Sequence, residues 1–294
     1  MQIFLLGKNG QLGWELQRTL ATLADLITLD FPEIDLTRPE LVCEMIRKIR
    51  PALIINATAY TQVDKAEGEL ELAMAINGVA PGRLAETASG IGAALIHYST
   101  DYVFDGKKGS PYTEYDPVNP INAYGRTKLA GDQAVASLAR SYWIFRTSWV
   151  FSLRRDSYVT KVLSWAREQS VLRIVDDQVG SPTWCRSLAE ITAQLIARAG
   201  ETPQDWIAER RGLYHLAGDG AASRFELAKE ILRLDPRSDE QVCTEILPAS
   251  THDFPAPAQR PLYTALNCDL FKDTFGLCLP AWQRALRLAM EVPQ

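Results

Sequence analysis

Tyr124 and Lys128 form the one Tyr-x-x-x-Lys pair in this sequence, and these residue types at this spacing could perform acid chemistry. A tyrosine hydroxyl has an ordinary pKa of about 10 and holds its proton too firmly for chemistry near neutrality. Residues four apart share one face of a helix, so we expect the Lys128 ammonium to lie near the Tyr124 hydroxyl. A neighbouring positive charge favours the phenolate and lowers the pKa of the phenol. The pair therefore predicts a tyrosine that exchanges a proton with a substrate.

A glycine-rich segment near the N-terminus favours this catalytic interpretation over an exposed helix face, where the same pair also occurs by chance. Residues 1–6 form a short apolar run typical of a buried strand, and leucines recur at helical spacing over 12–20. Gly7, Gly10 and Gly13 lie where the strand gives way to the helix. In a dinucleotide site the first glycine permits the tight turn and the second lets the backbone approach a diphosphate. The third lets the helix pack closely on the sheet. An ordinary β–α turn is the alternative.

An acidic residue at the end of the next predicted strand marks the expected ribose site. Residues 26–30 are typical of a second buried strand, and Asp30 ends it about 20 residues after the glycines. A carboxylate at this place binds the adenosine ribose hydroxyls and repels the 2′-phosphate of NADPH. On charge alone Asp30 favours NADH, and a surface acid at a strand end is the alternative.

Composition excludes several classes of protein. The chain has 294 residues, 47% of them hydrophobic, and a net charge of −5 without a basic stripe, which argues against nucleic acid as a partner. No apolar run is long enough to span a membrane. The five cysteines are scattered, odd in number and without a Cys-x-x-Cys motif, so neither a disulfide framework nor a zinc site is expected. A reducing cytoplasm is the expected compartment.

Predicted strands and helices alternate through the first half of the chain, which indicates an α/β fold with a doubly wound parallel sheet of the Rossmann type. We expect a dinucleotide-binding domain over residues 1–150, with returning segments near 187–218. Residues 151–294 are expected to form mainly a smaller α/β substrate-binding lobe. Thr37 and Asp64 are expected to cap the helices that follow the second and third strands.

Four motifs spread over the first half resemble the extended short-chain dehydrogenase/reductase family. They are Gly7-x-x-Gly10-x-x-Gly13, Asn56-Ala-Thr-Ala59, Ser99-Thr100 and Tyr124-x-x-x-Lys128. Longer segments narrow the resemblance to the dTDP-4-dehydrorhamnose reductases, a group within that family. These segments are 7–16, 63–67, 97–104, 124–131, 145–150, 177–183, 212–216 and 260–261.

The resemblance implies NAD(P)H-dependent reduction of the C4 ketone of dTDP-6-deoxy-L-lyxo-4-hexulose to dTDP-L-rhamnose. It implies that Tyr124 donates the proton, that Lys128 lowers the pKa of Tyr124 and binds the nicotinamide ribose, and that Thr100 polarises the carbonyl. NADPH is the expected cofactor and NADH remains possible. Whether the substrate carries thymine, and which sugar epimer it is, stays open, because the base would be bound by the irregular second lobe.

The resemblance also assigns binding positions along the chain. For the cofactor they are Gly7, Gly10, Gln11, Leu12, Gly13, Asp30, Asp35, Leu36, Ala59, Tyr60, Thr61, Tyr124 and Lys128. For the sugar nucleotide they are Thr100, Asp101, Trp149 and Arg260. A core role for Trp149 and a surface ion pair for Arg260 are the alternatives.

The resemblance leaves the assembly and a rival function open. Some relatives are thought to dimerise through a divalent ion held by carboxylates, and Glu15 is present here. Arg186 stands where another carboxylate would be expected, so we predict no metal site and a monomer or weak homodimer. The alternative functions are a reductase or epimerase of another nucleotide 4-keto sugar, and a regulatory subunit of the methionine adenosyltransferase type without catalysis.

Overall fold

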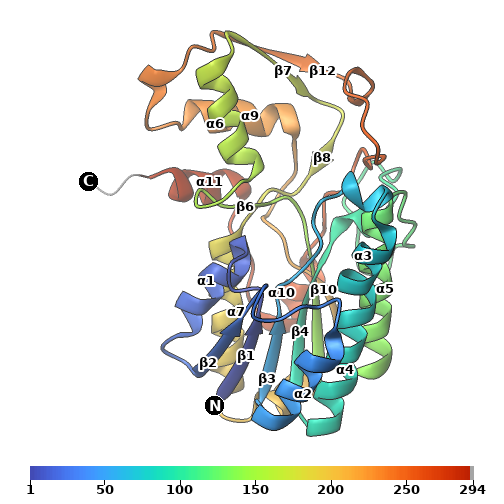
Figure 1. The fold of residues 1–294 in the computed structure, drawn as a ribbon. Coiled ribbons are helices and arrows are strands. Elements are labelled where there is room, and N and C mark those ends of the chain that lie inside the picture. The colour runs from blue at the N-terminus through green and yellow to red at the C-terminus, as the bar shows by residue number, and fades with distance from the viewer. Residues whose placement is uncertain (292–294) are drawn as a thin grey trace.

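A six-stranded parallel sheet forms the centre of the molecule (Figure 1), as seen in a computed structural model that describes residues 1–291. From one edge to the other the strands are β2 (Asp25–Leu29), β1 (Gln2–Leu6), β3 (Leu53–Asn56), β4 (Ala94–Thr100), β5 (Tyr142–Thr147) and β10 (Gly212–His215). Every neighbouring pair is parallel. The predicted Rossmann-type fold class is confirmed.

The central strands are apolar because helices cover both faces of the sheet. All four residues of β3 and all seven of β4 are buried. Strands buried on both faces read as continuous apolar runs, as the sequence did here. The strand order reverses at β1, which pairs with β2 on one side and β3 on the other. In such sheets ligands bind beyond the carboxyl ends of the strands at this reversal.

Two helical layers enclose this sheet. One layer comprises α1 (Gln11–Leu20), α7 (Cys185–Ala199), α8 (Pro203–Glu209) and α10 (Asp269–Phe275). The other comprises α2 (Pro39–Ile49), α4 (Ala80–Ile91) and α5 (Ala123–Leu138), with α3 (Leu70–Met74) and the π-helical turn η2 (Ala75–Val79) leading into α4. Residues 187–218 therefore supply helices and the edge strand β10 to the sheet layer, and the late helix α10 also packs there through Phe271 and Phe275.

A second, smaller lobe lies beyond the carboxyl edge of the sheet, at the top of Figure 1. Its helices are α6 (Tyr158–Glu168), α9 (Arg224–Arg233) and α11 (Trp282–Met290). Its strands are β6 (Val150–Phe151), β7 (Val171–Val175), β8 (Val179–Gly180), β9 (Thr183–Trp184), β11 (Ala222–Ser223) and β12 (Glu245–Ala249). These elements share an apolar core of their own, in which Phe151, Leu227 and Trp282 are buried. Single-turn 3-10 helices occur at η1 (Lys65–Glu67), η3 (Asp101–Val103), η4 (Ser238–Glu240) and η5 (Thr251–Asp253).

The two expected helix caps are wrong. The cap position of α2 is Arg38, and the Thr37 hydroxyl instead donates to the Asp35 carboxylate at 2.7 Å. Asp64 makes no side-chain hydrogen bond to the η1 turn, because its carboxylate binds Arg260. The helix that carries Tyr124 does have a cap: Asn122 accepts the Gly125 N–H at 2.8 Å. No helix within residues 1–291 is long and apolar enough to cross a membrane.

Candidate active site

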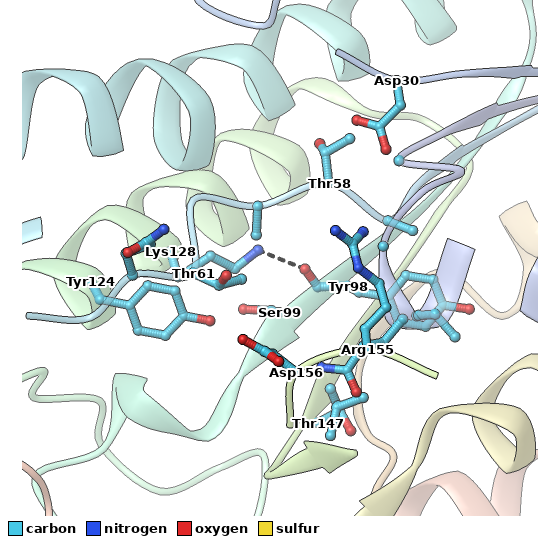
Figure 2. Close-up of a pocket in the computed structure, with 18 residues that line it drawn as sticks. Asp30, Thr58, Thr61, Tyr98, Ser99, Tyr124, Lys128, Thr147, Arg155 and Asp156 are labelled. Carbon is cyan, nitrogen blue, oxygen red and sulfur yellow. Dashed lines mark hydrogen bonds between the residues drawn. The ribbon is translucent and has the colours of Figure 1, made fainter. Parts of the chain in front are cut away.

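A cavity of about 560 Å³ lies at the carboxyl ends of β1, β3 and β4 (Figure 2). Its lining residues are Gly7, Gly10, Gln11, Leu12, Asp30, Ala57, Thr58, Ala59, Thr61, Gln62, Tyr98, Ser99, Tyr124, Lys128, Thr147, Val150, Arg155 and Asp156. The glycine-rich turn and the Tyr–Lys pair, far apart in the sequence, thus line one cavity. The topological reversal in the sheet explains why the cavity forms here.

The glycine turn is shaped so that backbone can approach a bound group. Gly7 has a φ of +92°, and a Cβ at this position would lie 2.9 Å from the carbonyl carbon of Ala57. A Cβ at Gly13 would lie 2.0 Å from the carbonyl oxygen of Gly7, so side chains are sterically excluded from the turn. Gly10 caps α1, and no side chain occupies the N–H groups of the first turn. These free N–H groups and the positive end of the helix dipole fit an anionic diphosphate.

Asp30 lies on the rim of the cavity beside this turn. Its carboxylate accepts the backbone N–H of Asn9 at 2.9 Å and that of Phe31 at 2.8 Å. The two bonds leave acceptor capacity on the carboxylate, since each oxygen has two lone pairs. The position and remaining acceptors fit the ribose hydroxyls of a dinucleotide.

Lys128 reaches the cavity from α5 and is 1% exposed. Its ammonium donates a hydrogen bond to the carbonyl oxygen of Tyr98 at 2.6 Å, shown as the dashed line in Figure 2. Burial disfavours the charged form and lowers the pKa of Lys128 to about 8, although the nearby Asp132 carboxylate works in the other direction. The ammonium is therefore held beside the cavity by a backbone acceptor and titrates much closer to neutrality than an exposed lysine.

The pKa of Tyr124 moves opposite to the expected direction. Loss of hydration raises the pKa of this phenol, and the Thr100 hydroxyl counteracts the shift only in part. The Lys128 ammonium, which donates to the Tyr98 carbonyl, is not among the main causes of this shift. The ring packs edge-on against Tyr102, with 5.8 Å between ring centroids. Tyr124 is thus a protonated phenol facing the cavity.

Thr100 and Asp101 lie next to this phenol, but they are not among the residues that line the cavity. The buried Asp101 carboxylate accepts hydrogen bonds from the hydroxyls of Ser148 at 3.0 Å, Thr264 at 2.5 Å and Thr100 at 3.2 Å. Burial raises the pKa of Asp101, and these three hydroxyls oppose that rise. The structure therefore places Asp101 as an interior anchor that fixes the position of Thr100.

Trp149 and Arg260 also lie outside the cavity lining. Trp149 has a φ of +45°, and its ring packs between Gly180 and the Arg224 guanidinium, which stands 3.4 Å from the ring centroid. Arg260 donates to both oxygens of Asp64, at 2.5 and 2.7 Å. The ion pair considered as the alternative for Arg260 is thus present in the structure.

Four expected cofactor positions are not brought to the cavity lining. Asp35 accepts the Thr37 N–H at 2.9 Å, and Leu36 belongs to the apolar core under α2. The Tyr60 hydroxyl donates to Glu69 at 2.6 Å. Gly13 packs against Gly7 rather than facing the cavity.

Sequence reasoning missed several residues that do line the cavity. Thr58 and Gln62 flank the expected stretch Ala59–Thr61, so their neighbours in the sequence could have indicated them. Ser99 precedes the selected Thr100, and Thr147 ends β5, so strand ends were again the signal. The remaining missed residues are Ala57, Tyr98, Val150, Arg155 and Asp156. The last two come from the irregular segment after β6, where no pattern pointed to them.

No group of three metal-ligating side chains occurs in the part of the chain that the structure describes. Glu15 is buried, and loss of hydration raises the pKa of its carboxyl. Arg186 pairs with Glu190 at 2.8 Å on the same face of α7. A cation therefore stands beside the two carboxylates that could have contributed to such a group.

Known proteins share this architecture over the full length of the chain. Residues 1–293 match the family model of the RmlD substrate binding domain. The chain is 41% identical over 293 residues to a dTDP-4-dehydrorhamnose reductase of Burkholderia thailandensis, a match that covers 99% of this chain and 98% of that relative.

Solved structures give the same result. The crystal structure of a dTDP-4-dehydrorhamnose reductase from Clostridium acetobutylicum is similar with a TM-score of 0.90 and 34% identity, over 99% of this chain and 98% of that one. The enzyme from Bacillus anthracis, solved in complex with NADP, has a TM-score of 0.87 and 34% identity, over 98% and 97%. The resemblance inferred from the motifs is confirmed. Together with the glycine turn and the Tyr–Lys pair in one cavity, this full-length agreement shows that the chain belongs to the dTDP-4-dehydrorhamnose reductase family.

Proposed function

We propose that this chain reduces the C4 ketone of dTDP-4-dehydrorhamnose to dTDP-L-rhamnose with NADPH, and that Tyr124 donates the proton. One observation carries the proposal: the anion-binding glycine turn and the Tyr124–Lys128 pair line the same cavity. A dinucleotide bound with its diphosphate at the turn would extend toward the Tyr–Lys pair. The named activity of the full-length relatives supports the substrate.

The cofactor would be held by residues that the cavity brings together. Gly7, Gly10, Gln11 and Leu12 would bind the diphosphate, and Asp30 the adenosine ribose. NADPH stands first because a relative binds NADP, and NADH remains an alternative because Asp30 places a negative charge near the ribose. When bound, the reduced nicotinamide supplies the hydride. Asp35, Leu36 and Tyr60 do not line the cavity, so they would contact the cofactor only if it extends beyond the lining residues.

Tyr124 would act as the general acid. A phenol whose pKa is raised by burial keeps its proton at neutral pH and has it available for an oxygen that gains negative charge. The proton on the Tyr124 hydroxyl would move to the substrate oxygen as the carbonyl carbon is reduced. The Lys128 ammonium would stabilise the phenolate left behind. Thr100, whose hydroxyl is bound to Asp101 and lies beside the Tyr124 phenol, would polarise the substrate carbonyl.

We propose further that residues 1–150, with the returning segments near 187–218, bind the cofactor and that residues 151–294 bind mainly the sugar nucleotide. Trp149 and Arg260 would contact the substrate at the boundary, and Arg260 would have to exchange Asp64 for a phosphate. The proposed assembly is a monomer or weak homodimer. A cytoplasmic location is proposed because all five cysteines are free thiols.

The test is oxidation of NADPH or NADH, followed by the absorbance of the reduced nicotinamide. The substrate is dTDP-4-keto-6-deoxyglucose, with or without the 3,5-epimerase, for the wild type and Tyr124→Phe. Oxidation that requires the epimerase and collapses in Tyr124→Phe would support the proposal. Oxidation without the epimerase would identify a reductase of another 4-keto sugar. Binding of NADPH without any oxidation would favour the regulatory subunit.

A further inference from the structure

The segment Ser152–Ser157 connects β6 to α6 and returns to the glycine turn of the first lobe. Both of its arginines donate hydrogen bonds to the carbonyl oxygen of Asn9, Arg154 at 3.1 Å and Arg155 through Nη1. Arg155 lines the cavity, whereas Arg154 does not. A residue of the second lobe thus contributes to the part of the cavity that would bind the cofactor.

The segment is held in place at several points. The Ser157 hydroxyl donates to the Ser152 carbonyl at 2.7 Å, which closes the turn, and the Arg154 N–H binds the Ser152 hydroxyl at 3.0 Å. The Arg154 guanidinium lies 4.6 Å from the centroid of the Trp14 ring on α1, a ring that Arg18 also contacts at 3.2 Å. These contacts fix the backbone of Arg155 next to the glycine turn.

Charge distinguishes Arg155 from the other lining residues. Among the described residues of the lining, four are aspartate, lysine or arginine: Asp30, Lys128, Arg155 and Asp156. Lys128 is committed to the Tyr98 carbonyl at the tyrosine end. In Figure 2 the Arg155 guanidinium points toward the side of Thr58 and Asp30, whereas the Asp156 carboxylate points toward Ser99 and Tyr124. Arg155 is therefore the lining cation on the side of the glycine turn.

The hydrogen-bond inventory leaves Arg155 able to bind a second acceptor. A guanidinium carries five N–H donors, and the Asn9 carbonyl uses one of them. The Asn9 N–H binds Asp30 on the other side of the same residue. Asn9 thus lies between the Asp30 carboxylate and the Arg155 guanidinium, and the next residue, Gly10, is the N-cap of α1.

We propose that Arg155 is a ligand for the diphosphate of the dinucleotide cofactor, bridging the Asn9 carbonyl and the phosphate oxygens. The inference rests on the proposed function, since it assumes that the cavity takes NADPH. A planar guanidinium suits paired phosphate oxygens better than an ammonium does. The second lobe would then contribute directly to cofactor affinity, in addition to binding substrate.

The experiment is isothermal titration calorimetry of the full chain with NADPH, NADH and ADP-ribose, without sugar nucleotide. ADP-ribose keeps the diphosphate and lacks the nicotinamide, and NADH lacks the 2′-phosphate. Arg155→Gln is expected to raise Kd about tenfold for all three ligands, because a charged hydrogen bond is lost. Arg155→Lys is expected to recover part of the affinity. Arg284→Gln removes the same charge from the exposed face of α11, outside the cavity lining, and is expected to change Kd less than about twofold.

Three results would overturn the assignment. A loss confined to NADPH would place Arg155 at the 2′-phosphate. An equal loss in Arg284→Gln would indicate a general charge effect, and unchanged affinities would remove Arg155 from the site. Thermal unfolding of the variants checks folding, and a fall in the midpoint is not expected because Arg155 is exposed. Binding is measured without substrate, so it does not depend on the proposed reaction. If that reaction does not occur, the calorimetry would still show Arg155-dependent binding while the oxidation assay shows no turnover.

Discussion

The two ends of the cavity are built from different parts of the chain. At the glycine end much of the surface is backbone, and its shape depends on the absence of side chains at Gly7 and Gly13. At the tyrosine end the surface consists of polar side chains whose properties depend on burial, as the opposite pKa shifts of Tyr124 and Lys128 illustrate. We infer that cofactor binding at the glycine end depends on the steric exclusion of side chains from the turn. Proton transfer at the tyrosine end depends on how far burial shifts the pKa values of the side chains.

The largest expected effect is a loss of catalysis at the tyrosine end without a loss of NADPH binding at the glycine end. Tyr124→Phe removes the proton donor and leaves the glycine turn untouched, so kcat is expected to fall about 10²- to 10⁴-fold while the Kd of NADPH stays unchanged. Steady-state kinetics and calorimetric titration measure the two quantities. A parallel loss of NADPH affinity would show that the ends are not independent.

A methyl group in the glycine turn should weaken NADPH binding, which Tyr124→Phe leaves unchanged. In Gly13→Ala the new Cβ would lie 2.0 Å from the Gly7 carbonyl oxygen, which is backbone and cannot move aside cheaply. The free energy of unfolding is expected to fall by about 3 kcal/mol, and the Kd of NADPH to rise on the order of 100-fold. Denaturant unfolding and calorimetry give both values.

Gly90→Ala is the matched control for that substitution. Gly90 lies in α4, and a Cβ added there would meet no heavy atom within 4 Å. The same methyl group should therefore raise the free energy of unfolding by about 0.5–1 kcal/mol through helix propensity. Equal destabilisation by both substitutions would contradict the steric account of the turn.

The tyrosine end should respond to pH through Lys128. Its pKa is lowered to about 8, so the ammonium is charged below this pH and neutral above it. If the charge stabilises the phenolate, kcat/KM is expected to be level below about pH 8 and to fall about tenfold per unit at higher pH. Lys128→Arg keeps its charge and should abolish that decline. A wild-type profile without a decline above pH 8 would argue against a role for the charge.

The smallest effect is expected at the Asp64–Arg260 pair, outside both ends. Asp64→Asn should lower the free energy of unfolding by less than about 1 kcal/mol, because the Asp64 side chain is 43% exposed and solvent screens the pair. Released from its carboxylate, Arg260 should bind the sugar nucleotide better, with a KM reduced less than about fivefold. A higher KM would mean that Asp64 positions Arg260 for binding.

The sequence was informative where a residue type is required by backbone geometry. Gly7 and Asp30 could be placed near one cavity because a tight turn and a strand end locate them within the first β–α–β unit, and the order of apolar runs predicted the sheet. The direction of the Tyr124 pKa shift could not be predicted, because it depends on how much water the folded protein removes.

Residues positioned by distant contacts were equally hard to assign. The local sequence around Asp64 predicts a helix cap, whereas the partner that determines its position, Arg260, is 196 residues away. Arg155 lies in an irregular segment whose return to Asn9 has no local signal, since that contact spans 146 residues. Patterns of nearby residues do not encode contacts of this range.

The Asp101 carboxylate bears on when the protein can become catalytically active during its synthesis. It accepts hydrogen bonds from the hydroxyls of Thr100, of Ser148 just after β5, and of Thr264, which lies 163 residues after Asp101. The hydroxyl network around Thr100 is complete only when the segment that carries Thr264, close to the C-terminus, has emerged. The sheet layer is completed equally late, because β10 and the helix α10 belong to it. A nascent chain should therefore complete both its sheet layer and its hydroxyl network only after nearly all of it has left the ribosome.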